Sequence, residues 1–341
     1  MLDYLNGTRT LETDILRTYA SAPGKVILTG EHFVVFGAPA LAIAINRRIV
    51  VGVNQRTDRR LHIVSSLGKS GEFEQDKFNL EEGGPEARDF LEPVRIAAES
   101  VLKRYGANKG LNIQVNSDVP VASGLGSSSA ISVATVASVG EAIGLNLSKE
   151  EILDLSLTAE RFVHKNPSGI DIAIATFGGT ILYERERGMT RIEDMPNLAL
   201  VIGNTGIARN TGSLVESVRR RRDHFPSTIN PLIAAAQALT GSAVEALRAR
   251  DLEKLGELLD INHGLLAAVG TSCIELDRLV YAARSVGALG AKLTGAGGGG
   301  CMIALCSDEN LVTVSEAIRR ANGSPITVVK TEEGVLTWKE N

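Results

Sequence analysis

The sequence predicts an α+β protein of two domains. Its 341 residues are more than a single hydrophobic core usually serves. Short apolar runs typical of strands are interspersed with amphipathic stretches typical of helices, a pattern that indicates layered sheets and helices. A polar segment at 184–197 separates two such series. We therefore expect a first domain over residues 1–190 and a second over residues 191–341.

The first half begins with strands and continues with helices. Apolar runs at 25–28, 33–36 and 41–45, broken by glycine and proline, predict an antiparallel set of strands. An amphipathic helix is expected over 86–105, a strand over 111–115 and a second helix over 127–143. A third helix starts at Ser148, which can form a capping box with Glu151, and ends near Pro167. A short strand at 180–183 closes this half.

The second half returns to strands and helices after the polar segment. Residues 198–202 predict a strand, and several helices follow between residues 211 and 286. A strand at 302–305, a helix at 311–320 and a strand at 326–330 complete the pattern. Strands covered by helices in this way are typical of an α+β domain.

Composition and charge exclude several classes of protein. With 44% hydrophobic and 22% charged residues, the chain has the composition of a soluble globular protein. A net charge of -4 predicts no general attraction to nucleic acid or to anionic membranes. No apolar stretch reaches the roughly 18 residues that cross a bilayer, and no signal peptide is evident, so we expect a cytoplasmic protein. Cys273, Cys301 and Cys306 then act as reduced, small apolar residues.

The most informative motif is a glycine- and serine-rich turn at 120–130, which follows a strand pattern and leads into a helix. Glycines let the backbone approach an anion closely, and the first amides of a helix have no intrahelical acceptor. A structural turn before a buried helix is the alternative, but it does not account for two glycines and three hydroxyls together. We expect phosphate binding by Ser123, Gly124, Leu125, Gly126, Ser127, Ser128 and Ser129.

A second glycine cluster at 295–300 matches the dinucleotide-binding pattern G-x-G-x-x-G only in its letters. A dinucleotide fingerprint follows a strand and opens a helix, whereas this cluster leads into the strand predicted at 302–305. The P-loop pattern G-x-x-x-x-G-K-[ST] occurs nowhere in the chain. A bound nucleotide would therefore be held without a P-loop lysine.

Two acidic residues lie where apolar neighbours are expected. Glu160 shares a helical face with Leu153 and Leu157, where a divalent cation could compensate its charge, although a solvated helix edge is an equal alternative. Asp171 opens a run of small apolar residues, and taken alone an N-cap role for residues 172–176 is the better explanation. Taken singly, Lys25 needs no functional explanation.

Taken together, four segments resemble the GHMP kinase superfamily, the small-molecule kinases of galactose, homoserine, mevalonate and phosphomevalonate. They are APGKVILTGEHFVVFG at 22–37, PVASGLGSSSA at 120–130, NPSGID at 166–171 with FGG at 177–179, and KLTGAGGGGC at 292–301. Within the superfamily, the GEH and KLT segments resemble the mevalonate kinase family most closely.

The resemblance implies roles for individual residues. Asp171 would accept the proton of the substrate hydroxyl, and Lys25 beside it would stabilise the negative charge. Ser128 and Glu160 resemble the Mg²⁺ ligands, although Ser-Ser-Ser-Ala here replaces the family's usual Ser-Ser-Ala-Ala and leaves the metal-binding hydroxyl open by one position. The substrate-binding residues implied are Lys25, Glu31, His32, Asp171, Arg209, Thr211 and Gly297.

The resemblance also implies a fold and an activity. The fold would join an N-terminal ATP-binding domain similar to domain 2 of ribosomal protein S5 to a C-terminal ferredoxin-like domain, with the active site between them. The expected reaction is phosphorylation of the primary (C5) hydroxyl of mevalonate by ATP with Mg²⁺, in isoprenoid precursor synthesis. Homodimers are common in the family, although nothing in the sequence requires one.

Two alternatives stay open. One is another GHMP small-molecule kinase such as a phosphomevalonate kinase, which would need more basic residues at the substrate end of the site. The other is a regulator that binds nucleotide and metabolite without catalysis. The presence of both Asp171 and Lys25 argues against the regulator.

Overall fold

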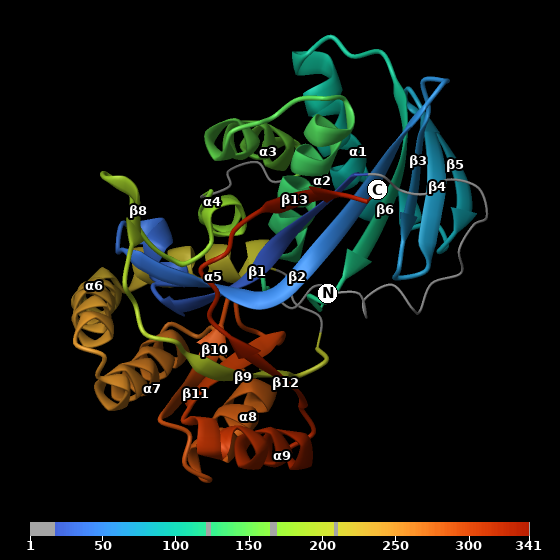
Figure 1. The fold of residues 1–341 in the computed structure, drawn as a ribbon. Coiled ribbons are helices and arrows are strands. Elements are labelled where there is room, and N and C mark those ends of the chain that lie inside the picture. Colours follow the sequence, from blue (N-terminus) through green and yellow to red (C-terminus); the bar gives the residue numbers. More distant parts are fainter. Residues whose placement is uncertain (1–17, 121–123, 164–168, 208–210, 341) are drawn as a thin grey trace.

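The described residues form two β-sheets, and the chain passes from the large sheet to the small one and back. The computed structural model describes residues 18–120, 124–163, 169–207 and 211–340, except the side chains of residues 162, 163 and 211. In Figure 1 the small sheet lies beneath the large one, with α1 to α4 above and α8 and α9 below. The mixed arrangement of helices and sheets agrees with the predicted α+β class.

The large sheet has nine strands among the described residues. Their order is β13-β1-β2-β6-β3-β4-β5, with β7 paired to β2 and β8 paired to β7. Its strands are β1 (Thr18–Thr29), β2 (Ala40–Arg56), β3 (Leu61–Ser65), β4 (Lys69–Glu74), β5 (Lys77–Glu82), β6 (Gly110–Ser117), β7 (Thr180–Glu184), β8 (Gly188–Ile192) and β13 (Leu336–Lys339). Strands β1 and β2 are antiparallel, as predicted.

Three helices pack on the large sheet, α1 (Ala87–Arg104), α2 (Ser127–Ala142) and α4 (Ile170–Phe177), and α3 (Lys149–Val163) packs against these helices. Helix α2 is buried almost all round and consists mainly of Ala, Val and Ser, so small side chains let it lie directly on β1 and β2. The capping box predicted for α3 is present, because Ser148 and Glu151 exchange hydrogen bonds of 2.9 and 3.2 Å. Helix α2 starts directly after the glycine turn and runs through the core.

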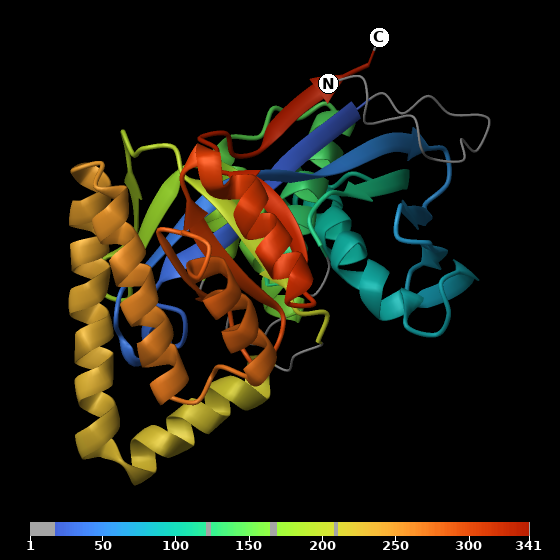
Figure 2. The ribbon, with the colours of Figure 1, turned by 90° about the horizontal axis from the view of Figure 1, so that it is seen from below.

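The small sheet has the order β10-β11-β9-β12 and is antiparallel throughout. Its strands are β9 (Ala199–Asn204), β10 (Gly290–Thr294), β11 (Cys301–Cys306) and β12 (Ser324–Val329). Helices α7 (Leu252–Ala268), α8 (Ile274–Arg284) and α9 (Leu311–Arg320) pack on it. Helix α6 (Pro226–Arg248) packs beside α7, and α5 (Thr211–His224) lies across the end of α6 (Figure 2).

Three segments differ from the expectation. Residues His32–Phe36 form a 3₁₀ helix, η2, so the strand predicted at 33–36 is wrong: Gly30 and Gly37, both with φ of +96°, turn the chain at each end of this segment. Strand β8 lies inside the polar segment expected to be a boundary and forms a hairpin with β7. Strand β13 returns from the small sheet and pairs with β1, where Trp338 stacks on Tyr19. The division at 190/191 stays a prediction.

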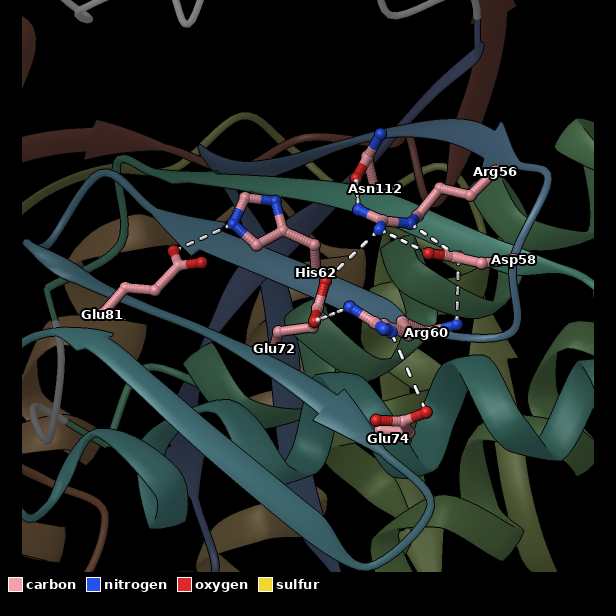
Figure 3. A network of polar contacts seen from close by, with 8 residues as sticks. All are labelled: Arg56, Asp58, Arg60, His62, Glu72, Glu74, Glu81 and Asn112. Carbon is pink, nitrogen blue, oxygen red and sulfur yellow. Dashed lines mark hydrogen bonds and ion pairs between the residues drawn. The ribbon is translucent and has the colours of Figure 1, made fainter.

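The face of the large sheet opposite α1 carries charged side chains. Arg56 donates to Asp58 at 2.6 and 2.8 Å and to Asn112 at 2.8 Å, and Arg60 donates to Glu72 at 3.0 Å (Figure 3). We call the eight residues of Figure 3 the outer charge network: Arg56, Asp58, Arg60, His62, Glu72, Glu74, Glu81 and Asn112. None of the described helices is both long and apolar enough to cross a membrane.

Candidate active site

The glycine turn lies directly against β1. Gly124 and Gly126 have φ of +81° and +75°, values that L side chains rarely adopt. The backbone N–H of Lys25 donates to the carbonyl of Leu125 at 2.8 Å. A Cβ on Gly126 would lie 2.8 Å from Cγ of Lys25, so only glycine permits this approach. The turn is thereby fixed beside the lysine.

The same turn opens helix α2 without a side-chain cap among the described residues. Gly126 is the N-cap, and Ser127, Ser128 and Ser129 form the first turn, whose amides have no intrahelical acceptor. These amides and the positive end of the helix dipole form a site suited to phosphate. The structure therefore provides the strand, turn and helix order that the phosphate prediction required. Ser123, also predicted there, lies outside the described residues.

Lys25 and Asp171 form an ion pair across two elements. Lys25 is on β1, and Asp171 is in the first turn of α4, which starts after Gly169. The ammonium Nζ lies 3.1 Å from Oδ1 of the carboxylate. The lysine side chain is 6% exposed and the aspartate side chain 34%, so the carboxylate remains accessible to a substrate while its partner is buried.

Glu160 on α3 lies beside this pair. It is 7% exposed, and its Oε1 accepts a hydrogen bond of 2.8 Å from the Ser129 hydroxyl. The pKa of Glu160 is raised to about 6, mainly by burial and also by the charge of Asp171, while the hydrogen bond from Ser129 and the charge of Lys25 oppose the rise. Its Oε2 is buried and has no hydrogen-bond partner among the described residues.

The hydroxyl that bonds to Glu160 is that of Ser129, and the assignment of Ser128 as a metal ligand stays a prediction. Ser128 lies half-buried in the same first turn of α2. The described residues contain no cluster of three or more His, Cys, Asp or Glu side chains that could hold a metal. A cation bound at Glu160 would therefore complete its shell with hydroxyl, water or phosphate oxygens, which suits Mg²⁺.

Glu31 and His32 connect the two sheets. The Glu31 side chain is 1% exposed and contacts the ammonium of Lys292 on β10, and its Oε2 accepts from Asn262 on α7 at 3.2 Å. His32 Nε2 lies 2.6 Å from the carbonyl oxygen of Ala296. Both predicted substrate residues therefore reach the small sheet and the loop that follows it.

The second glycine cluster joins β10 to β11 as a hairpin, since Thr294 pairs with Cys301. This confirms that it is not a dinucleotide-binding turn, because no helix follows it. Gly298 N donates to the carbonyl of Thr271 at 2.8 Å, and a Cβ on Gly297 would lie 2.0 Å from that oxygen. The loop is therefore held against the segment between α7 and α8.

Some predicted residues are not placed, and others were missed. Arg209 lies outside the described residues, as does the side chain of Thr211, the first residue of α5. Lys292 and Asn262, the partners of Glu31, were not among the predicted site residues. For Lys292 a signal existed: it is a charged residue within the apolar strand 290–294, which is buried throughout.

Comparison with known proteins agrees with this geometry. Residues 92–179 match the GHMP kinases N terminal domain, and residues 243–324 match the GHMP kinases C terminal domain. Mevalonate kinase of Pyrococcus horikoshii is 40% identical over 327 residues, covering 93% of this chain and 96% of that protein. Mevalonate kinase of Thermococcus gammatolerans is 41% identical over 333 residues, covering 94% and 98%.

Solved structures lead to the same group. The crystal structure of L. major mevalonate kinase in complex with R-mevalonate superposes with a TM-score of 0.79 at 29% identity, covering 92% of this chain and 96% of that one. The predicted two-domain GHMP kinase architecture is confirmed. With such similarity over nearly its whole length, the chain belongs to the GHMP kinase family and, within it, groups with the mevalonate kinases.

Proposed function

We propose that the protein transfers the terminal phosphoryl group of ATP to the primary (C5) hydroxyl of mevalonate, with Mg²⁺. One observation carries the proposal: the Lys25–Asp171 pair lies against the glycine turn, because Lys25 bonds to Leu125 through its backbone N–H and to Asp171 through its ammonium. An acid and an amine thus lie beside a phosphate-binding helix terminus. The mevalonate kinase relatives and the neighbour bound to R-mevalonate support mevalonate as the acceptor.

In the proposed site, the amides of the first turn of α2 bind phosphate oxygens of ATP. Ser128, Ser129 and Glu160 are the candidates for holding Mg²⁺, since the buried Oε2 of Glu160 lacks a partner among the described residues. When bound, the cation neutralises charge on the phosphates. Arg209, Thr211 and Gly297 remain candidates for substrate binding.

The transfer step then uses the ion pair. Asp171 accepts the proton of the C5 hydroxyl, the hydroxyl oxygen bonds to the terminal phosphorus, and the bond from that phosphorus to the bridging oxygen of ADP breaks. Lys25 stabilises the negative charge that develops near Asp171. Positioning and charge neutralisation are the main requirements of phosphoryl transfer, and this arrangement meets both.

A substrate panel tests the proposal. Purified protein is assayed for ADP release with ATP, Mg²⁺ and, separately, mevalonate, phosphomevalonate, homoserine and galactose. We expect mevalonate to give a kcat/KM at least about 100-fold above the others, because each unmatched polar group in a buried site costs affinity. Preference for phosphomevalonate would replace the proposal with the sibling kinase, and nucleotide binding without turnover would favour the regulator.

A further inference from the structure

The pair formed by Lys292 and Glu31 is the most deeply buried ion pair among the described residues. The exposed fractions of the two side chains are 0% and 1%. The lysine ammonium contacts Oε1 of Glu31 and also donates to the carbonyl of Ile27 at 3.4 Å, while Asn262 donates to Oε2. Both carboxylate oxygens are thus engaged inside the protein.

Such a pair is costly to bury. Burial lowers the pKa of Lys292, whereas the Glu31 carboxylate opposes this, and Lys25 adds to the lowering. Replacing a buried ion pair by apolar residues of similar volume is often neutral or stabilising. Ile303, which pairs with Lys292 across β10 and β11 and shares its face of the sheet, is part of the hydrophobic core. Stability alone therefore gives no reason for a charge at this position.

The position of the pair points to another role. Ile27, whose carbonyl accepts from Lys292, is two residues from Lys25 on the same strand β1. The Thr294 hydroxyl donates to the same carbonyl at 3.2 Å, and His32 contacts Ala296 in the glycine loop. These contacts fix β1 and the turn after it to β10 and its loop. The small sheet is thereby attached to the strand that carries Lys25.

We infer that Lys292 is a positioning residue for phosphoryl transfer: by holding Glu31 and the Ile27 carbonyl, it keeps Lys25 directed at Asp171, and Glu31 acts in this pair instead of contacting the substrate. The inference rests on the proposed function. It revises the substrate-binding role that the sequence suggested for Glu31.

A double-mutant cycle tests the inference. Glu31→Gln, Lys292→Met and the double variant are compared for kcat, for the KM of mevalonate and for thermal unfolding. We expect each variant to lower kcat about tenfold or more, the double variant to be no worse than the poorer single variant, and KM to change less than about threefold. A kcat loss in the double variant equal to the product of the single losses overturns the inference.

Failure of one variant to fold leaves the test intact. Lys292→Met alone leaves an unpaired buried carboxylate, whereas the double variant removes both charges and is expected to fold. The comparison then uses Glu31→Gln and the double variant: equal kcat with unchanged KM supports the inference. A rise of about tenfold or more in the KM of mevalonate for Glu31→Gln means that Glu31 contacts the substrate, which overturns it.

A matched control uses the ion pair between Arg284 and Asp260. It holds the same strand, since Arg284 donates to the carbonyl of Ala291 at 2.6 Å and Ala291 N donates to Asp260 at 2.7 Å, but none of its described contacts reaches β1. We expect Asp260→Asn to keep kcat within about twofold of the wild type. An equal kcat loss in this control would assign the effect to β10 packing in general and overturn the inference.

The two proposals fail in different ways. If the wild type phosphorylates none of the four alcohols, the proposed function fails, and crystal structures of the wild type and the double variant still test the positioning role. We expect the distance from Lys25 Nζ to Asp171 Oδ1, 3.1 Å here, to lengthen in the double variant. An unchanged distance overturns the inference whatever the substrate.

Discussion

The candidate active site and the outer charge network both consist of charged residues, but they differ in burial and in how completely the charges are paired. In the network, Arg56 bonds to Asp58 and Asn112, and Asp58 is 38% exposed (Figure 3). In the site, Glu160 is 7% exposed and one of its oxygens lacks a partner among the described residues. The number of ion pairs therefore does not distinguish the candidate site from the network, whereas the incompletely paired, buried charge of Glu160 does.

The physical reason is the environment of the charges. Exposed pairs interact weakly because water screens them, and each contributes about 0–1 kcal/mol. Buried charges interact strongly, and a buried group without a partner is unfavourable until a ligand supplies one. A ligand can therefore supply a partner to the buried Oε2 of Glu160. The charged residues of the outer charge network already pair with one another.

The largest expected effect comes from replacing the same residue type in both regions. Asp171→Asn should lower kcat about 100- to 10,000-fold with ATP affinity retained, because the amide cannot accept the hydroxyl proton. Asp58→Asn should keep kcat within about twofold, since Asp58, whose backbone carbonyl accepts from Gly110 N, lies at the end of β6 away from the glycine turn. Steady-state kinetics and nucleotide titration check both. If the Asp171→Asn enzyme kept more than about a third of the wild-type kcat, the assignment of Asp171 as the proton acceptor would be refuted.

A second comparison concerns the metal. Glu160→Gln removes the buried charge, so the Mg²⁺ concentration for half-maximal rate should rise about tenfold or more, which corresponds to about 1.4 kcal/mol. The control Glu72→Gln lies in the outer charge network and should leave the Mg²⁺ dependence unchanged. Rates measured across a Mg²⁺ series decide the matter. Superimposable curves for Glu160→Gln and wild type would remove Glu160 from the metal site.

A third comparison tests the close approach of the glycine turn. Gly126→Ala places a Cβ 2.8 Å from Lys25 Cγ at φ of +75°, so we expect a loss of about 1–3 kcal/mol in the free energy of unfolding and a fall in kcat. Gly144→Ala, at φ of +84° with no atom within 4 Å, should cost about 1 kcal/mol and leave kcat unchanged. Urea unfolding and kinetics measure both. Equal kcat in the two variants would show that the turn does not position Lys25.

The smallest expected effect on kcat comes from His263, a buried histidine next to Asn262, whose influence is on stability. Burial, with a further contribution from Arg284, lowers the pKa of His263 to about 4, below the ordinary value of 6.5. Its Nε2 donates to Asp277 at 3.2 Å and its Nδ1 accepts from Leu293 N at 3.3 Å, so the neutral ring is the one that fits.

The folded state then binds fewer protons than the unfolded state between those two pKa values. The stability due to neutral His263 is complete above pH 6.5 and is lost as the pH falls towards 4, with a slope of up to about 1.4 kcal/mol per pH unit. Urea unfolding from pH 4.5 to 7.5 should show this slope, and His263→Gln should reduce it. An unchanged slope in the variant would assign the acid sensitivity to other groups.

Much of the fold was predictable because local patterns and tertiary packing agree. Helix α9 is found at 311–320 as predicted, and α1 and α2 differ from prediction by one residue at their ends. Predictions failed where local signals conflict with the chain path. Residues 33–36 are apolar like a strand, yet glycine turns on both sides make them a 3₁₀ helix. Strand β13 was missed because its pairing with β1 joins residues more than 300 positions apart.

The candidate site shows the same division. The two glycines before a predicted helix indicated the phosphate-binding turn. The position of Glu160 on the apolar face of α3 indicated a charge in need of compensation. The hydrogen bond between Ser129 and Glu160 could not be predicted, because it depends on how α2 and α3 face each other. The partnership of Lys292 with Glu31 likewise depends on packing between β10 and the turn after β1.

The sequence by itself determined the helix and strand periods, the two glycine turns and the identity of the residues able to accept a proton or bind phosphate. These follow from local geometry, since a positive φ or an amphipathic period is a property of neighbouring residues. Only the tertiary structure decided which charges meet: Lys25 with Asp171, Ser129 with Glu160, Lys292 with Glu31. Burial and partner distance set the energy of a charge, and both arise only when distant segments pack together.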